Sequence, residues 1–155
     1  MATRSAGILP YRWRDGGIEV LLVHPGGPFW ARKDIGAWSV AKGEYVEPEQ
    51  AFDAALREFQ EETGLAPRGS FIELAPLRQP SGKIVSAWAV ELDWDPAKLV
   101  SNTFELEWPK GSGTLKRFPE ADRAEWFAVP EAMQRILPGQ RGFVEELARR
   151  LVRRG

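Results

Sequence analysis

Three glutamates near the middle of the chain are spaced so that their side chains can act together. Glu58, Glu61 and Glu62 are related as i, i+3 and i+4, which places all three carboxylates on one face of a helix. Like charges at this spacing repel by about 0.2–0.5 kcal/mol per pair. A sequence that keeps them together therefore indicates a bound cation, and carboxylate oxygens favour Mg²⁺ or Mn²⁺.

The glutamates belong to a longer pattern with specific spacing. The segment from Gly43 to Leu65 resembles the Nudix box, written GX5EX7REUXEEXGU with U an apolar residue. Every fixed position of the box is filled, by Gly43, Glu49, Arg57, Glu58, Phe59, Glu61, Glu62, Gly64 and Leu65. The resemblance implies a Nudix (MutT-like) hydrolase that uses a divalent metal to cleave a nucleoside diphosphate linked to another group. An isolated glutamate pair would more often mark a solvated surface helix, but the complete spacing favours the enzyme.

The resemblance also implies roles for individual residues. Glu58 corresponds to a metal-bound carboxylate that also serves as general base, while Glu61 and Glu62 correspond to the other helix ligands. The carbonyl of Lys42 or Gly43 often completes such a site. We therefore expect a divalent cation to bind at the start of the box and on its helix.

One further acidic ligand usually comes from outside the box in families of this kind. Glu120 is the best candidate, because it stands six residues before Trp126, where related Nudix sequences carry an acidic residue ahead of a tryptophan and the next helix. Asp122 and Glu125 are rivals in the same segment, and any of the three also fits an ordinary surface charge.

A helix is expected to carry the box glutamates. It begins near Pro48, a residue tolerated in the first turn, and ends at Gly64, the usual residue in left-handed conformation after a helix. Its apolar face, which can pack on a sheet, is formed by Phe52, Leu56 and Phe59. Gly43, ahead of the helix, is expected to form a tight loop.

Arg57 and the remaining catalytic candidates complete the expected chemistry. Arg57 can pair with Glu49 or Glu61 and hold the carboxylates in register, so we group Arg57 and Glu61 with Glu58 as catalytic residues. Water would attack one phosphorus of a P–O–P chain, with Glu58 accepting the proton. Covalent catalysis is not indicated: cysteine is absent, and His24, the sole histidine, fits a structural hydrogen-bonding residue better than a base.

The rest of the chain alternates strand-like and helix-like segments. Strands are expected at residues 6–13, 18–23, 38–40, 70–77, 83–94 and 124–128. Helices are expected at residues 130–136 and 142–153. Loops or irregular regions are expected at residues 24–38 and 95–113. This order predicts an α/β fold, an α/β/α sandwich with a mixed central sheet, formed by one domain over residues 1–155; the Nudix resemblance implies the same fold.

Composition agrees with a small enzyme. The chain has 155 residues, is 43% hydrophobic and carries a net charge of −1, so no global field draws it to nucleic acid or membranes. The absence of cysteine excludes disulfides and thiolate zinc sites. No stretch approaches 18 apolar residues and no export signal is recognisable, so we expect a cytoplasmic protein.

The substrate is less clearly indicated. Candidate phosphate-binding cations are Arg32, Lys33, Lys42, Lys83 and Lys116. Candidate stacking surfaces for a base, each of which also fits an aromatic core, are Trp30, Trp88, Phe104 and Trp108. The segment WSVAKGE resembles the WxxPKGE entry of Nudix enzymes acting on diadenosine polyphosphates and on capped or triphosphorylated RNA ends, but it departs at Ala41.

Three functional hypotheses follow from these observations. The first is a hydrolase of a small nucleoside polyphosphate, either a dinucleoside tetraphosphate or an NTP. The second is a hydrolase of another diphosphate, such as ADP-ribose, a diphosphoinositol phosphate or an RNA 5′ end, the last being the one nucleic-acid substrate considered. The third is a noncatalytic Nudix-fold binding protein, which the intact box disfavours.

Overall fold

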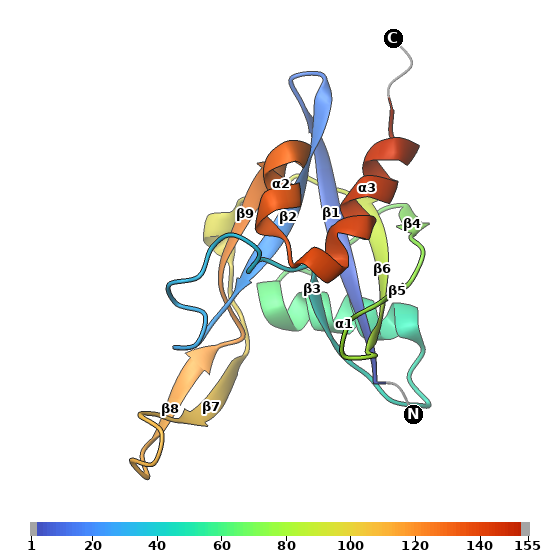
Figure 1. Ribbon diagram of the computed structural model, residues 1–155. Coiled ribbons are helices and arrows are strands. Elements are labelled where there is room, and N and C mark those ends of the chain that lie inside the picture. Colours follow the sequence, from blue (N-terminus) through green and yellow to red (C-terminus); the bar gives the residue numbers. More distant parts are fainter. Residues whose placement is uncertain (1–2, 153–155) are drawn as a thin grey trace.

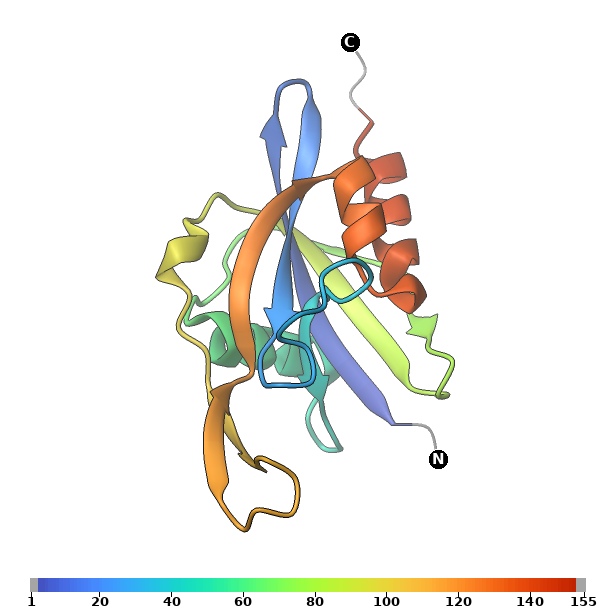
Figure 2. The same ribbon diagram turned by 60° about the vertical axis from the view of Figure 1, so that its left-hand side comes forward.

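The computed structural model describes residues 3–152, in which a mixed seven-stranded sheet lies between helices (Figures 1 and 2). The strands of this sheet are β1 (Arg4–Arg14), β2 (Gly17–Pro25), β3 (Ala41–Glu44), β4 (Phe71–Glu73), β5 (Leu77–Arg78), β6 (Ile84–Glu91) and β9 (Ala121–Ala128). The α-helices are α1 (Ala51–Thr63), α2 (Val129–Arg135) and α3 (Arg141–Arg150). A separate hairpin of β7 (Thr103–Glu107) and β8 (Leu115–Pro119) projects from the body. No helix within residues 3–152 is long and apolar enough to cross a membrane.

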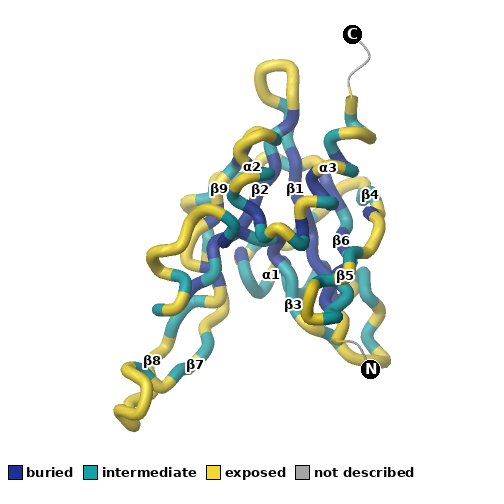
Figure 3. Tube along the Cα trace, in the orientation of Figure 1, coloured by how far each residue is buried: buried dark blue, intermediate teal, exposed yellow. Residues whose placement is uncertain are grey.

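The two faces of the sheet are covered by different helices, which confirms the predicted α/β/α arrangement. Successive residues of a strand point to opposite faces, so Ile8 packs in the apolar cluster under α1 while Leu9 packs in the cluster under α2 and α3. Phe59 anchors α1 in its cluster, and Phe143 anchors α3 in the other. Figure 3 shows the dark blue, buried residues concentrated in this central sheet.

Strand β1 organises the sheet because it has three strand neighbours. It pairs in parallel with β6 along residues 4–11. Its other edge is shared: β3 pairs antiparallel with residues 5–8, and β2 pairs antiparallel with residues 11–14. As a result β3 lies against the middle of the fold, where it also contacts α1. This arrangement brings Lys42 and Gly43 beside the glutamates of the helix.

Several sequence predictions about the box segment need correction. Helix α1 begins at Ala51 rather than near Pro48, which lies in a turn closed by the hydrogen bond from Glu49 N–H to the Val46 carbonyl. Its end at Gly64, with φ of 84°, is confirmed. The strand expected at residues 38–40 is instead β3, at residues 41–44, and Gly43 therefore lies in a strand rather than in a loop.

Other boundaries also differ from the prediction. The strand expected at residues 70–77 is divided into β4 and β5, both of which pair with β6. The region expected to be irregular at residues 95–113 contains β7, whose partner β8 was not predicted. Strand β9 starts at Ala121, three residues before the prediction, and α3 ends at Arg150. The last residue of the expected helix, Arg153, lies outside the described residues.

The packing of α1 on the sheet generates a stability prediction. Phe59 is fully buried, so Phe59→Ala should lower the free energy of unfolding by about 3–5 kcal/mol, because it removes apolar contacts and leaves a cavity. The neighbouring Gln60 is exposed, and Gln60→Ala should change the same quantity by no more than about 0.5 kcal/mol. Urea unfolding measures both values. Equal effects of the two substitutions would contradict this account of how α1 is held.

Candidate functional site

The three box glutamates face a cleft of about 440 Å³ at the end of the sheet where β3 meets α1. The residues lining it are Lys42, Gly43, Glu44, Glu58, Glu61, Glu62, Asn102, Thr103 and Glu120. They come from β3, from α1, from the base of the β7–β8 hairpin and from the start of β9. Five of these nine residues are glutamates, so the cleft gathers more negative charge than any of these elements carries alone.

Gly43 permits the closest approach in the cleft. A Cβ atom at this position would lie 2.0 Å from Glu58 Oε2 and 2.1 Å from the carboxyl carbon of Glu58. Atoms this close would overlap, so any other residue would displace the Glu58 carboxylate. The glycine is required by this close approach rather than by a tight loop, because it lies within β3 opposite Ala6.

Arg57 forms hydrogen bonds with three carboxylates of the box. Its guanidinium binds Glu49 with two hydrogen bonds, from Nε at 2.8 Å and from Nη2 at 2.9 Å. Its Nη1 donates to Glu58 Oε1 at 2.9 Å and to Glu61 Oε2 at 3.1 Å. The hydrogen bonds from Arg57 lower the pKa of Glu49. The predicted pairing of Arg57 with Glu49 or Glu61 is thus present with both, and Glu58 is held as well.

Burial disfavours the ionised form of the carboxylates that line the cleft. Burial raises the pKa of Glu62 to about 8, and repulsion from Glu58 adds to the effect. Burial also raises the pKa of Glu58, although Arg57 opposes that shift. The pKa of Lys42 is lowered, first by burial and then by the charge of Lys83. The protein's own cations therefore do not fully offset the cost of ionising Glu58 and Glu62.

The donor chemistry of the cleft fits a divalent cation. Glu62 Oε2 is buried and has no hydrogen-bond partner, although such groups are normally satisfied. Within residues 3–152, no three side chains of His, Cys, Asp or Glu lie close enough together in this conformation to hold an ion. Arg57 already binds one oxygen each of Glu58 and Glu61. An ion would draw on the orphaned Glu62 oxygen and on the remaining carboxylate oxygens.

The three acidic candidates outside the box lie in different surroundings. Glu120 lines the cleft, and its charge contributes to the raised pKa values of Glu58 and Glu62. Asp122 instead binds His24 Nδ1 through Oδ1 at 2.8 Å. Glu125 lines a separate cavity. Of the three candidates, the structure thus brings only Glu120 to the box glutamates.

Comparison with known proteins agrees with this arrangement. The chain matches the family described as NUDIX domain over residues 1–147. It belongs to the Nudix family. This match confirms the resemblance found in the box, and the chain is a Nudix hydrolase domain. Members of this family are typically pyrophosphohydrolases and generally depend on a divalent metal. None of the curated proteins matches the chain at a significant level.

Solved structures share the Nudix fold at low sequence identity. The C. elegans Ap4A hydrolase in a binary complex matches with a TM-score of 0.66 and 20% identity, over 95% of this chain and 97% of that chain. The NUDIX domain of Shewanella oneidensis NrtR, complexed with ADP ribose, matches with a TM-score of 0.65 and 16% identity, over 97% and 89% of the two chains. These similarities establish the fold.

The other residues singled out in the sequence are distributed around the Nudix core. His24 is fully buried, with Nε2 2.6 Å from the Lys33 carbonyl oxygen, and does not line the cleft. Lys83 lies at its rim, where its ammonium pairs with Glu44 at 3.0 Å. Trp88 stacks edge-to-face on Phe52 and belongs to the packing under α1. The remaining candidates lie on the 26–38 loop and on the β7–β8 hairpin: Trp30, Arg32, Lys33, Phe104, Trp108 and Lys116.

Sequence reasoning missed Glu44, Asn102 and Thr103 as cleft residues. Glu44 directly follows Gly43, so its position beside the box could have been noted. Asn102 and Thr103 reach the cleft because the Asn102 N–H donates to the Glu61 carbonyl at 2.8 Å, which fixes this distant segment to the end of α1. No local pattern signals that contact.

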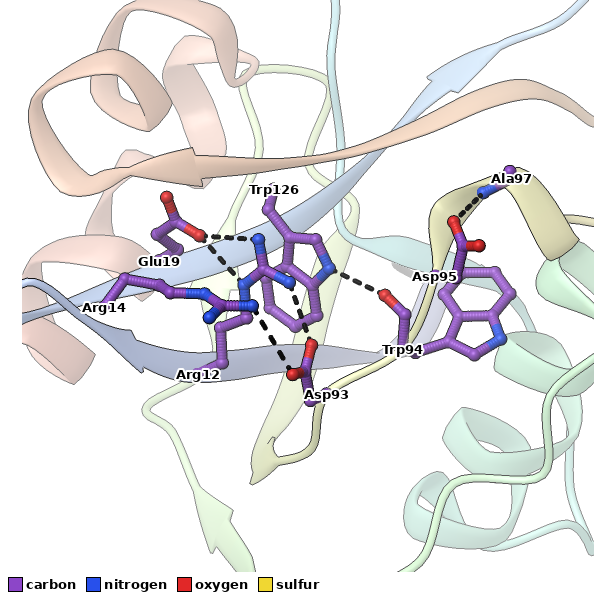
Figure 4. A network of polar contacts seen from close by, with 8 residues as sticks. All are labelled: Arg12, Arg14, Glu19, Asp93, Trp94, Asp95, Ala97 and Trp126. Atoms are coloured by element: carbon purple, nitrogen blue, oxygen red, sulfur yellow. Dashed lines mark hydrogen bonds and ion pairs between the residues drawn. The ribbon is translucent and has the colours of Figure 1, made fainter.

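A second missed feature is an arginine network beside a larger cavity, of about 770 Å³, along β9 (Figure 4). Arg12 pairs with Glu19 and Asp93, each at 2.9 Å, and its guanidinium lies 4.4 Å from the centre of the Trp126 ring. Trp126 Nε1 donates to the Trp94 carbonyl. These contacts join β1, β2, β9 and the segment after β6, so they hold strands together away from the cleft.

The raised pKa of Glu62 gives a pH prediction for the metal-free protein. Folded Glu62 keeps its proton up to about pH 8, whereas an ordinary glutamate loses it near 4.5, so stability falls as pH rises through this window. The slope should not exceed about 1.4 kcal/mol per pH unit, which corresponds to roughly 3–6 °C in Tm per pH unit. Thermal unfolding in EDTA between pH 5 and 8 measures it. Glu62→Gln should flatten the dependence, and an unchanged slope in that variant would contradict the assignment.

Proposed function

We propose that the chain, as one Nudix domain over residues 1–155, hydrolyses the pyrophosphate linkage of a nucleoside polyphosphate with the help of Mg²⁺ or Mn²⁺. The substrate is a dinucleoside tetraphosphate or an NTP, attacked by water. The observation that carries the proposal is the cleft in which Glu58, Glu61, Glu62 and Glu120 converge around a buried carboxylate oxygen without a partner. Such a site suits a cation that bridges the protein to a phosphate chain.

Each residue of the cleft has a proposed part in this reaction. The metal-binding set comprises Glu58, Glu61, Glu62, Glu120 and the carbonyl of Lys42 or Gly43. When bound, a divalent cation polarises phosphoryl oxygens and lowers the pKa of water. Glu58 accepts the proton of the attacking water, because its carboxylate is half-buried and held at one oxygen by Arg57.

Two cations of the protein support this chemistry. Arg57 keeps Glu58 and Glu61 in fixed orientation, and its bidentate bond to Glu49 prevents the guanidinium from turning away. Lys42 lines the cleft close to Glu58 and Glu62, where its ammonium offsets part of their charge and can bind a phosphoryl oxygen. Together they allow several carboxylates and a polyphosphate to occupy one small volume.

The alternative substrate is another diphosphate, such as ADP-ribose, a diphosphoinositol phosphate or an RNA 5′ end. The fold match to an Ap4A hydrolase favours the first proposal, and the match to a domain complexed with ADP ribose favours the alternative. Products formed from a panel of these compounds in ¹⁸O-labelled water, identified by mass spectrometry, distinguish them and report the attacked phosphorus. A noncatalytic binding protein would turn over none of them with either metal.

Loss of a cleft carboxylate should abolish most turnover. Glu58→Gln and Glu62→Gln should each lower kcat at least a hundredfold, because each removes a charge needed for the metal or for proton transfer. Asp53→Asn is a matched control, since Asp53 is exposed on the same helix and outside the cleft. Steady-state phosphate release measures activity, and circular dichroism checks folding. Near-normal turnover in both glutamine variants would overturn the site assignment.

The assignment of Glu120 can be tested against its rivals. Glu120→Gln should raise the Mg²⁺ concentration needed for half-maximal activity at least tenfold, because it removes one oxygen donor from the cleft. Glu125→Gln changes a β9 carboxylate outside the cleft and should leave this concentration within twofold. Metal titrations at saturating substrate compare the variants. A larger effect from Glu125→Gln would reject Glu120 as the external ligand.

A further inference from the structure

The 26–38 loop and the β7–β8 hairpin form one projecting unit, which we call the arm. Phe29 of the loop packs edge-to-face on Trp108 of the hairpin, with ring centroids 5.5 Å apart. Gly27 lies so close to Phe104 that a Cβ there would be 3.0 Å from that ring. Figures 1 and 2 show the loop and the hairpin on the same side of the molecule.

The arm starts at the cleft. At the base of the hairpin, Glu120 N–H donates to the Asn102 carbonyl at 2.8 Å, and the Glu120 carbonyl accepts from Gly26 N–H at 3.0 Å. Asn102, Thr103 and Glu120 all line the cleft. The base of the arm therefore forms part of the wall of the cleft that holds the box glutamates.

The hairpin has two chemically different faces. Residues paired across antiparallel strands point to the same side, so Phe104 with Phe118, and Leu106 with Lys116, share one face. Phe104 contacts the loop, which identifies this as the loop-facing side. Arg117 is on the opposite face, where it pairs with Glu105 at 3.6 Å. Lys116 and its neighbour Arg117 are thus adjacent in sequence but not in space.

The arm carries exposed aromatic surface and four cations, one of which, Lys33, has its ammonium 5.2 Å from the centre of the Trp30 ring. Phe29 is 62% exposed, and Figure 3 shows the arm as mostly exposed or intermediate; its buried residues, Gly26, Ala37 and Trp38, are at the ends of the loop. None of the cations Arg32, Lys33, Lys110 and Lys116 forms an ion pair within residues 3–152. A two-stranded hairpin alone is marginally stable in water, so the Phe29–Trp108 contact helps to hold the arm together. The four cations, by contrast, have no carboxylate partner within residues 3–152 that folding would supply.

Unpaired cations beside aromatic rings match the chemistry of a nucleotide, whose phosphates need positive charge and whose base stacks on rings. Resting on the function proposed above, we infer that the arm binds the second nucleoside of a dinucleoside polyphosphate while the scissile phosphates lie in the cleft. Phe29 and Trp108 contact the base, and Lys116 contacts phosphate between the two nucleosides. An NTP has no second nucleoside and does not engage this surface.

The experiment compares diadenosine tetraphosphate with ATP. Trp108→Ala and Lys116→Ala should each lower kcat/KM for the dinucleotide at least fivefold and leave kcat/KM for ATP within twofold, because only the longer substrate reaches the arm. Arg117→Ala removes the adjacent cation on the opposite face and should change neither value. Lys116 is exposed, so its substitution tests the inference even if Trp108→Ala perturbs the hairpin.

A binding measurement separates this inference from the proposed function. Calorimetry with a non-hydrolysable methylene analogue of diadenosine tetraphosphate should show weaker binding to Lys116→Ala than to the parent protein and to Arg117→Ala. Hydrolysis of the dinucleotide that is insensitive to both arm substitutions would overturn the arm and leave the function standing. If the protein turned over no phosphoanhydride at all, the proposed function would be overturned. If, in addition, the analogue bound equally well to the parent protein and to Lys116→Ala, the inference about the arm would be overturned too. The inference would also be rejected if Lys116→Ala lowered hydrolysis of a triphosphorylated RNA but not hydrolysis of the dinucleotide.

Discussion

The close contact between the Glu58 carboxylate and Gly43 is the constraint on which the site depends. It places a partly buried negative charge against the backbone of β3, where water cannot fully solvate it. The repulsion from Glu61, Glu62 and Glu120 makes that placement less favourable still. Only Arg57 and Lys42 oppose these charges within the described cleft. A cation bound to this arrangement would therefore stabilise the folded protein.

The fold supplies the rigidity that the arrangement needs. Ala54 and Ala55 are completely buried, and these small side chains let α1 approach the sheet closely. Phe59 then fills the apolar cluster beneath the helix. Because β1 shares one edge between β2 and β3, the β3 segment is anchored on the central strand of the sheet. Both sides of the Gly43–Glu58 contact therefore belong to well-packed elements.

The sequence was most informative where chemistry depends on spacing within one element. The i, i+3, i+4 pattern placed the glutamates of α1 on one cleft, and the pairing of Arg57 with Glu49 and Glu61 followed from local separation. Glu120 was selected only through its position ahead of Trp126, and the structure brings it to the box. Asn102 and Thr103 were not foreseen, since their location depends on contacts with the far end of α1. The β7–β8 hairpin was missed because Gly and Pro at its turn resemble an irregular loop.

These contacts also couple the arm to the carboxylates of the cleft. The backbone of Glu120 is bonded to Gly26 on the loop and to Asn102 on the hairpin, and Asn102 is in turn bonded to the Glu61 carbonyl. Gly26 has no room for a side chain, because a Cβ would lie 1.9 Å from the Pro119 carbonyl oxygen. A ligand that repositions the arm must therefore shift Glu120 or strain these bonds. Recognition of the distant part of a substrate and the geometry of the reacting part are linked through the same short run of backbone.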